Sequence, residues 1–121
     1  MPWNFSSDKP IFQQLVDRIT LDIIRKRYQP GQKLEAVREL SVIAGVNPNT
    51  MQRALSAIEE SGLIYTKRGD GRYVTDDPQV IKQAENEYVT ELVSDFYGKL
   101  NAIGLNHEEI MQAVESAGKD V

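Results

Sequence analysis

Residues 45–63 read GVNPNTMQRALSAIEESGL and decide the fold, because they describe a tight turn followed by one helix with two unlike faces. Asn47 can accept a hydrogen bond from an unpaired amide of the first turn, and Pro48 suits the first helical position, which needs no backbone donor. Ser61-Gly62 supplies a stop, since glycine suits the left-handed position after a helix. The pattern therefore predicts a helix from Pro48 to about Glu60.

The two faces of this helix have different chemistry when the residues are placed at about 3.6 per turn. The apolar face comprises Met51, Ala54, Leu55 and Ile58. The opposite face becomes acidic only at Glu59 and Glu60, and its first part carries amides, a hydroxyl and a guanidinium, from Asn49, Thr50, Gln52 and Arg53. Groups that can read base edges thus lie at the N-terminal end, as in a recognition helix that enters the major groove of DNA.

The segments before this helix complete a helix-turn-helix. Apolar residues recur through Ile11–Tyr28 and predict an amphipathic helix that ends near Tyr28. Pro30-Gly31 indicates a turn, Gln32–Leu34 a very short strand, and Val37–Ala44 a second helix that Gly45 ends. A helix, a turn that contains glycine and a second helix form the helix-turn-helix arrangement.

A β-hairpin is expected after the recognition helix. Residues 63–66 and 72–75 are β-prone and flank Lys67-Arg68-Gly69-Asp70-Gly71. The glycines at this tip let the backbone approach a phosphate or a minor groove closely, and Lys67 and Arg68 add positive charge. A helix-turn-helix followed by such a hairpin is a winged helix, so the predicted fold class is mainly α with a small β-hairpin.

The remaining residues predict a helical hairpin for dimerisation. A long helix is expected over Pro78–Ala102, and Asn106 with Glu109 indicates a capping box that opens a last helix. The apolar stripe of the long helix is too wide to be left in water, which predicts a homodimer interface. Its main residues are Tyr88, Leu92, Val93, Phe96, Leu100 and Ile103. The expected domains are therefore 1–75 for DNA binding and 76–121 for dimerisation.

Charge and composition agree with this division. The 121 residues carry a net charge of −4, but residues 1–75 hold 11 Lys and Arg against 8 Asp and Glu, whereas residues 76–121 hold 3 against 10. Only the basic front half needs to approach phosphate. The chain has no cysteine, no secretion signal and no run of about 18 apolar residues, so a cytoplasmic protein is expected.

The chain resembles the GntR family of bacterial transcription regulators, and its two-helix tail is similar to that of the YtrA-type subgroup. The resemblance covers most of the chain and rests on PIFQQLVDRI, PGQKL, VREL, GVNPNTMQRAL and ESGLIYTKRGDGRYV. It implies a homodimer that binds a palindromic operator in double-stranded DNA, usually as a repressor, and that dimerises through the C-terminal helices.

The resemblance also implies particular DNA contacts. The matching positions are Arg38 in the second helix, Asn47, Asn49, Thr50 and Gln52 around the recognition helix, and Gly69 in the wing; Arg53 directly follows Gln52. We expect Gln52 and Arg53 to act through the major groove, and Arg38 and Lys67 through phosphate.

The chain departs from the family pattern at two places. Glu35-Ala36 stands where the family commonly has Pro-Ser, and Asp70 lies at the wing tip. Alanine cannot cap a helix, and a carboxylate repels phosphate, so one backbone anchor is expected to be missing.

Other classes of protein are less consistent with the sequence. It shows no paired nucleophile and base, no phosphate-binding glycine loop and no clustered metal ligands, so no enzyme, cofactor or metal site is expected. The alternative is a winged helix that serves as a protein-interaction scaffold without sequence-specific DNA binding. A small-molecule effector of unknown identity stays open, because the sequence does not identify one.

Overall fold

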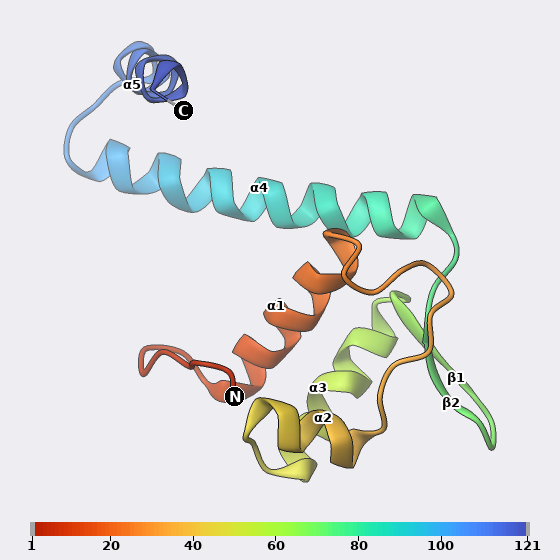
Figure 1. The fold of residues 1–121 in the computed structure, drawn as a ribbon. Helices are drawn as coiled ribbons and strands as arrows, with labels where there is room; N and C mark the ends of the chain where they lie inside the picture. Colours follow the sequence, from red (N-terminus) through yellow and green to blue (C-terminus); the bar gives the residue numbers. More distant parts are fainter. Residues whose placement is uncertain (1, 121) are drawn as a thin grey trace. The chain divides into compact units, whose positions relative to one another are not determined.

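The computed structural model describes residues 2–120 and confirms a mainly helical fold with one small β-hairpin. In chain order the elements are α1 (Ile11–Ile24), α2 (Val37–Ala44), α3 (Pro48–Glu60), β1 (Ile64–Lys67), β2 (Gly71–Val74), α4 (Pro78–Ala102) and α5 (His107–Lys119) (Figure 1). Contacts divide the chain into two compact units, of which the first ends at Glu85 and the second begins at Asn86. No helix in residues 2–120 is long and apolar enough to cross a membrane.

Helix α1 ends at Ile24, four residues before the end that its periodicity predicts. Lys26 adopts a left-handed conformation with φ 65°, which an α-helix cannot continue through. The amides of Arg27 and Tyr28 then both donate to the carbonyl of Asp22. The Tyr28 side chain packs against the core and its hydroxyl donates to Glu35 at 2.7 Å, so the chain leaves the helix to bury this ring.

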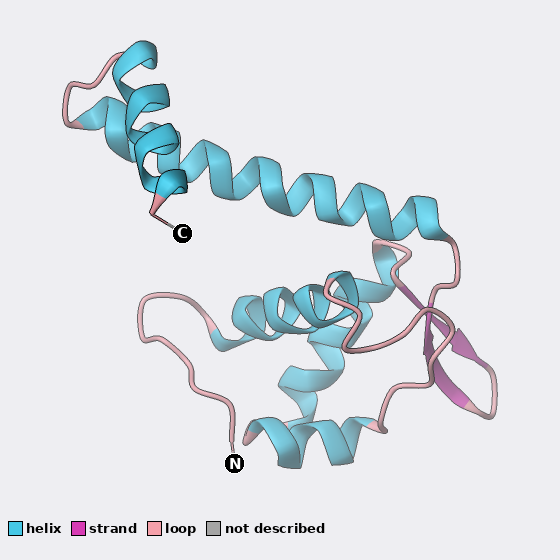
Figure 2. Ribbon diagram, turned by 45° about the horizontal axis from the view of Figure 1, so that its top comes forward, coloured by secondary structure: helices cyan, strands magenta, loops and turns pink. Residues whose placement is uncertain are grey.

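The helix-turn-helix forms as the sequence predicts (Figure 2). Gly45 ends α2 with φ 76°, and its amide and that of Val46 both donate to the carbonyl of Ser41. At the start of α3 the Asn47 side chain accepts from the amide of Asn49 at 2.7 Å, and Pro48 follows as the first helical residue. Ala36 before α2 makes no side-chain cap, as expected.

The wing is a two-stranded antiparallel hairpin in which Ile64 pairs with Val74 and Lys67 with Gly71. The strand predicted at Gln32–Leu34 is reduced to a single bridge between Lys33 and Tyr73. The same short segment is also bonded to β2 through the Leu34 amide to the Arg72 carbonyl, at 2.9 Å. The loop before α2 is therefore hydrogen-bonded along the edge of β2 that does not pair with β1.

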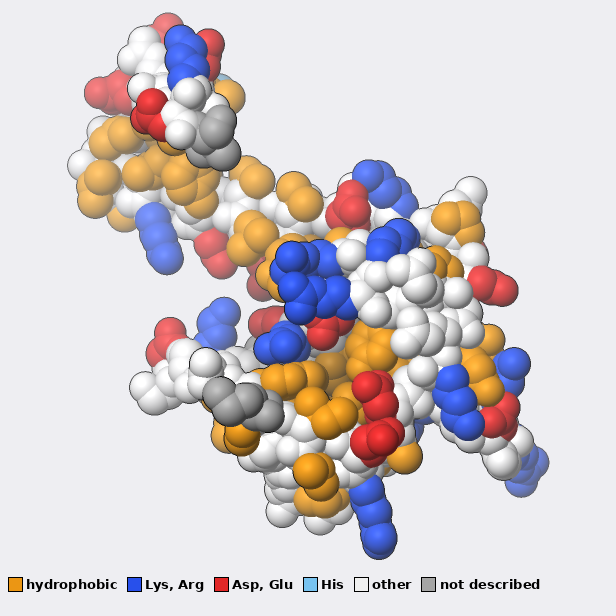
Figure 3. Space-filling model, in the orientation of Figure 1, with side chains coloured by type: hydrophobic (Ala, Val, Ile, Leu, Met, Phe, Trp, Pro, Cys, Tyr) orange, Lys and Arg blue, Asp and Glu red, His pale blue; other side chains and the backbone are white. Residues whose placement is uncertain are grey.

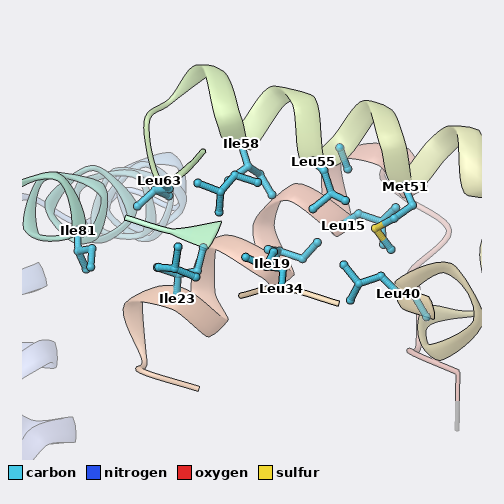
Figure 4. Close-up of a cluster of buried hydrophobic side chains, with 14 residues drawn as sticks. Leu15, Ile19, Ile23, Leu34, Leu40, Met51, Leu55, Ile58, Leu63 and Ile81 are labelled. Atoms are coloured by element: carbon cyan, nitrogen blue, oxygen red, sulfur yellow. The ribbon is translucent and has the colours of Figure 1, made fainter. Parts of the chain in front are cut away.

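The core of the first unit fixes which face of α3 remains exposed. Met51, Leu55 and Ile58 of α3 point toward α1 side chains that include Leu15 and Ile19 (Figure 4). Each large apolar side chain buried here contributes roughly 1.5–3 kcal/mol. Ile81 at the start of α4 also belongs to this core and is only 4% exposed, so the first unit includes the first turns of α4.

An N-terminal strap, residues 2–10, also packs on the first unit, and no sequence pattern predicts it. Trp3 and Phe5 lie against the core, and the Trp3 amide donates to the carbonyl of Ala44 at 3.2 Å. The Gln14 side chain holds the strap by donating to the carbonyls of Ser6 and Lys9 and accepting from the Ser6 amide, at 2.8–2.9 Å. The strap therefore reaches the turn of the helix-turn-helix.

The second unit consists of the rest of α4 and α5. Asn106 and Glu109 form the predicted capping box, with hydrogen bonds of 2.9 and 3.0 Å. The Tyr97 hydroxyl lies 2.7 Å from His107 Nδ1, which joins the two helices, and Ile110 is buried. Much of the apolar surface of α4 is nevertheless exposed.

Candidate nucleic-acid interface

Helix α3 presents its polar N-terminal face to solvent. Asn49, Gln52 and Arg53 are exposed and Thr50 is half-buried, whereas the core residues of the helix are fully covered. Asn47 is exposed as well, and its side-chain oxygen is used as the helix cap. The NH2 group of the same side chain is not used by the cap and keeps two hydrogen-bond donors.

The Arg53 side chain is held by an aromatic ring of α1. Its guanidinium carbon lies 4.8 Å from the centre of the Phe12 ring, a cation–π contact, while the residue as a whole stays exposed. A guanidinium stacked on one face keeps its edge donors free for a planar bidentate acceptor such as guanine. Phe12 thus orients a predicted base-reading residue, a role that the sequence did not reveal.

Two further arginines are available for phosphate. Arg38 on the first turn of α2 and Arg68 at the wing tip are exposed, and neither forms an ion pair with another residue in 2–120. Figure 3 shows Lys and Arg side chains at the outer end of the hairpin. Cations without internal partners retain their full charge for a phosphate backbone.

The wing tip combines an open glycine with an aromatic stack. Gly69 has φ 78°, and a Cβ added there would meet nothing within 4 Å, so glycine is required by the backbone conformation and not by lack of space. Lys67 Nζ lies 4.3 Å from the centre of the Tyr73 ring, which stacks on Tyr65 at 5.9 Å. The Lys67 ammonium is therefore supported by one face of the hairpin.

The acidic end of α3 is tied to the wing. The Thr66 hydroxyl donates to Glu59 at 2.8 Å, and Arg72 Nε donates to the same carboxylate oxygen at 3.3 Å. These contacts join the recognition helix to both strands, which limits how far the wing can move relative to α3. The charge of Glu59 is also compensated within the protein by Arg72.

The two departures from the family pattern have internal partners. Glu35 accepts from the Tyr28 hydroxyl, and burial together with this bond raises the pKa of Tyr28 above its usual value. Asp70 accepts from the Tyr73 hydroxyl and from Lys33 Nζ, which lower the pKa of its carboxyl in that order. Both carboxylates therefore have hydrogen-bond partners within the protein.

The predicted dimerisation residues lie in the second unit. Leu92 is 54% exposed and Ile103 is 73% exposed; Val93 and Phe96 are also exposed, and Tyr88 and Leu100 are half-buried. Figure 3 shows hydrophobic side chains gathered over the outer part of α4. The α5 residues Met111 and Val114 add further exposed apolar area.

A helix-turn-helix with a polar recognition face, followed by a hairpin with cations at its tip, defines a winged helix-turn-helix DNA-binding protein. The model of the family described as "Bacterial regulatory proteins, gntR family" matches residues 11–74, and the chain belongs to this family. This confirms the resemblance to GntR regulators and places the chain among transcription regulators.

Two curated relatives match almost end to end. The uncharacterised HTH-type transcriptional regulator YhcF of Bacillus subtilis is 33% identical over 93% of this chain and 93% of its own length. The HTH-type transcriptional repressor YtrA of the same organism is 27% identical over 95% of this chain and 89% of its own. Matches of this length extend beyond residue 74 into the C-terminal helices, so the similarity to YtrA includes α4 and at least part of α5.

Solved structures show the same fold. A GntR family transcriptional regulator from Listeria monocytogenes superposes with a TM-score of 0.86 at 40% identity, over 93% of this chain and 98% of that one. The DNA-binding domain of AraR in complex with operator ORE1 matches with a TM-score of 0.54 at 27% identity, over 61% of this chain and 90% of that one.

Proposed function

We propose that this regulator is a repressor that binds a palindromic operator as a homodimer. The observation that carries the proposal is the exposed N-terminal face of α3, whose side chains are uncharged or basic. This face is turned to solvent because Met51, Leu55 and Ile58 on the other face are buried in the core. Support comes from the DNA-binding domain of AraR, whose crystal structure is a complex with operator ORE1, and from YtrA, which is named a repressor. No specific observation favours the alternative, a protein-interaction scaffold without sequence-specific DNA binding.

Within this proposal, Gln52 and Arg53 read bases while Arg38, Lys67 and Arg68 contact phosphate. The division follows from position: the first two lie on the exposed face of α3 and the others on α2 and the wing. In winged and helix-turn-helix proteins the recognition helix occupies the major groove and flanking elements touch the backbone. Asn47, Asn49 and Thr50 complete the surface at the start of α3, and Gly69 allows the tip to come close.

Pairing through α4 and α5 would supply the dimer. The exposed apolar side chains include Leu92, Phe96 and Ile103, and each one buried is worth roughly 1.5–3 kcal/mol. A two-fold partner presents the same stripe, so one surface serves both copies. Two recognition helices about 34 Å apart then reach successive major grooves, which a single unit cannot do.

A duplex titration tests DNA binding against the scaffold alternative. The purified protein should bind mixed-sequence DNA at low salt, and the logarithm of its affinity should fall linearly with the logarithm of salt concentration, because phosphate contacts release counterions. A protein-interaction scaffold that makes no phosphate contacts would show no such salt-dependent binding.

Operator release by a small molecule is the open part of the proposal. A thermal-shift screen against metabolites, followed by release of labelled operator, would identify an effector. A compound that raises the melting temperature and lowers operator affinity would be one, because a ligand that binds only one state stabilises that state.

A further inference from the structure

The wing tip contains an acid in a place where a free acid would oppose DNA binding. Asp70 follows Arg68-Gly69, and its carboxylate accepts from the Tyr73 hydroxyl at 2.6 Å and from Lys33 Nζ at 2.9 Å. Lys33 comes from the loop before α2, 37 residues earlier in the chain. We name the group Lys33, Asp70 and Tyr73 the wing clip.

The backbone is shaped to let the clip form. Gly71 has φ 145°, and a Cβ added there would lie 3.0 Å from Lys33 Cε, so the stem of Lys33 passes directly over this glycine. Lys33 is also bridged to Tyr73 through the main chain. The side-chain contact is thus anchored at both ends, and Gly71 supplies room that another residue would fill.

The clip also organises the cations of the tip. Tyr73, which donates to Asp70, is the ring that carries Lys67 on one face and stacks with Tyr65. The Asp70 amide closes the turn by donating to the Lys67 carbonyl at 2.9 Å. Side chain and amide of Asp70 together fix the short turn that presents Arg68 and Gly69.

We propose that Asp70 is a positioning residue for DNA binding, which together with Lys33 and Tyr73 holds the wing tip in its DNA-binding conformation. This inference rests on the proposed function. A tip with glycines at two of its five positions has many alternative conformations, and ordering it before binding removes an entropic cost from association. Asp70 therefore contributes to affinity although its charge has the same sign as phosphate.

The alternative reading predicts the opposite sign. If Asp70 acted only through its charge, Asp70→Asn would strengthen binding to all sequences, Lys33→Met would weaken it, and the two effects would add. The clip predicts that each change weakens operator binding by about 3- to 10-fold. The double variant should lose no more affinity than the single variant with the larger loss, because both changes break one unit.

Tyr73→Phe separates the two readings most cleanly. It removes only the hydroxyl that donates to Asp70 and leaves the ring under Lys67 and the net charge unchanged. We expect a loss of affinity similar to that of Asp70→Asn, whereas a purely electrostatic role predicts none. Asp76→Asn is the matched control, since it removes an equal charge from an exposed carboxylate outside the clip.

Hydrogen exchange on the DNA-free protein gives a readout independent of DNA binding. The amides of Asp70 and Leu34, which donate to the Lys67 and Arg72 carbonyls, should exchange faster in Tyr73→Phe and Asp70→Asn than in the parent. Unchanged exchange, or unchanged or tighter operator binding by these variants, would overturn the clip. If the parent bound no duplex, the proposed function would fail, and exchange alone would still decide whether the clip fixes the wing.

Discussion

At the residue scale, the residue types at the two ends of α3 were sufficient to predict its caps, and its periodicity was sufficient to predict its buried face. The partners of its exposed residues were not predictable, because they come from segments distant in the sequence. Phe12 under Arg53 and Arg72 beside Glu59 are examples, since no periodicity links these pairs. Helix caps depend on neighbours within a few residues, whereas such contacts depend on how elements pack.

Replacement of Arg53 tests the assignment of base reading. We expect Arg53→Ala to weaken operator binding by about 1–3 kcal/mol and to relax sequence preference, because a bidentate contact to a base edge is lost. Arg38→Ala should instead weaken all sequences alike and reduce the salt dependence. Competition binding with operator and scrambled duplex measures both effects. Unchanged affinity and preference in Arg53→Ala would refute the assignment.

Gly45 should be among the most sensitive glycines. Gly45→Ala places a Cβ at φ 76° and only 2.8 Å from Pro2 Cβ, so it combines backbone strain with a steric clash. We expect the free energy of unfolding to fall by about 2 kcal/mol or more in chemical denaturation. Gly69→Ala has nearly the same φ, 78°, but open space around it, and so measures the strain alone. Equal losses in the two variants would show that the strap does not press on the turn.

At the element scale, the sequence predicts all seven helices and strands. Their type followed from the period of the apolar residues and from the glycines, prolines and capping residues between them. The predicted end of α1 was wrong by four residues, because the chain leaves the helix after Ile24 and buries the Tyr28 ring against the core. The strand predicted before α2 forms only a single β-bridge, between Lys33 and Tyr73. The strap was not predicted as structure, since nine residues without periodicity do not reveal that Trp3 and Phe5 reach the core.

The strap gives a prediction with a neighbouring control. Gln14→Ala removes three hydrogen bonds to the strap and should lower the free energy of unfolding by about 1–3 kcal/mol. Gln13→Ala removes only an exposed hydrogen bond to Asp17 on the same helix and should change it by less than about 0.5 kcal/mol. Thermal or denaturant unfolding of the two variants makes the comparison. A similar stability of both would indicate that the strap is not held by Gln14.

At the whole-molecule scale, the uneven charge and the wide apolar stripe of α4 predicted two functions in one chain. The structure divides the chain at Glu85–Asn86, and Ile81 packs into the first unit's core. The boundary after Thr75 stays a prediction about function. A chain shortened to test it should end after Glu85, so that the loss of Ile81 does not destabilise the DNA-binding unit.

Dimerisation should depend on the exposed stripe of α4. We expect Leu92→Asp to give a monomer in sedimentation experiments at concentrations where the parent is a dimer, because a charge cannot be buried unpaired in an apolar interface. Asn101→Asp makes the same charge change on the opposite side of the helix by spacing and should leave the dimer intact. A Leu92→Asp protein that sedimented like the parent would exclude the α4 stripe as the interface.

Selection of genomic fragments by the purified protein tests the central claim most directly. The account predicts enrichment of an inverted repeat whose half-site centres are about one helical turn, or a multiple of it, apart, because two recognition helices are related by a two-fold axis. The chain that ends after Glu85 should bind the same half-site only weakly. Failure to enrich any inverted repeat, with and without added metabolites, would contradict the account.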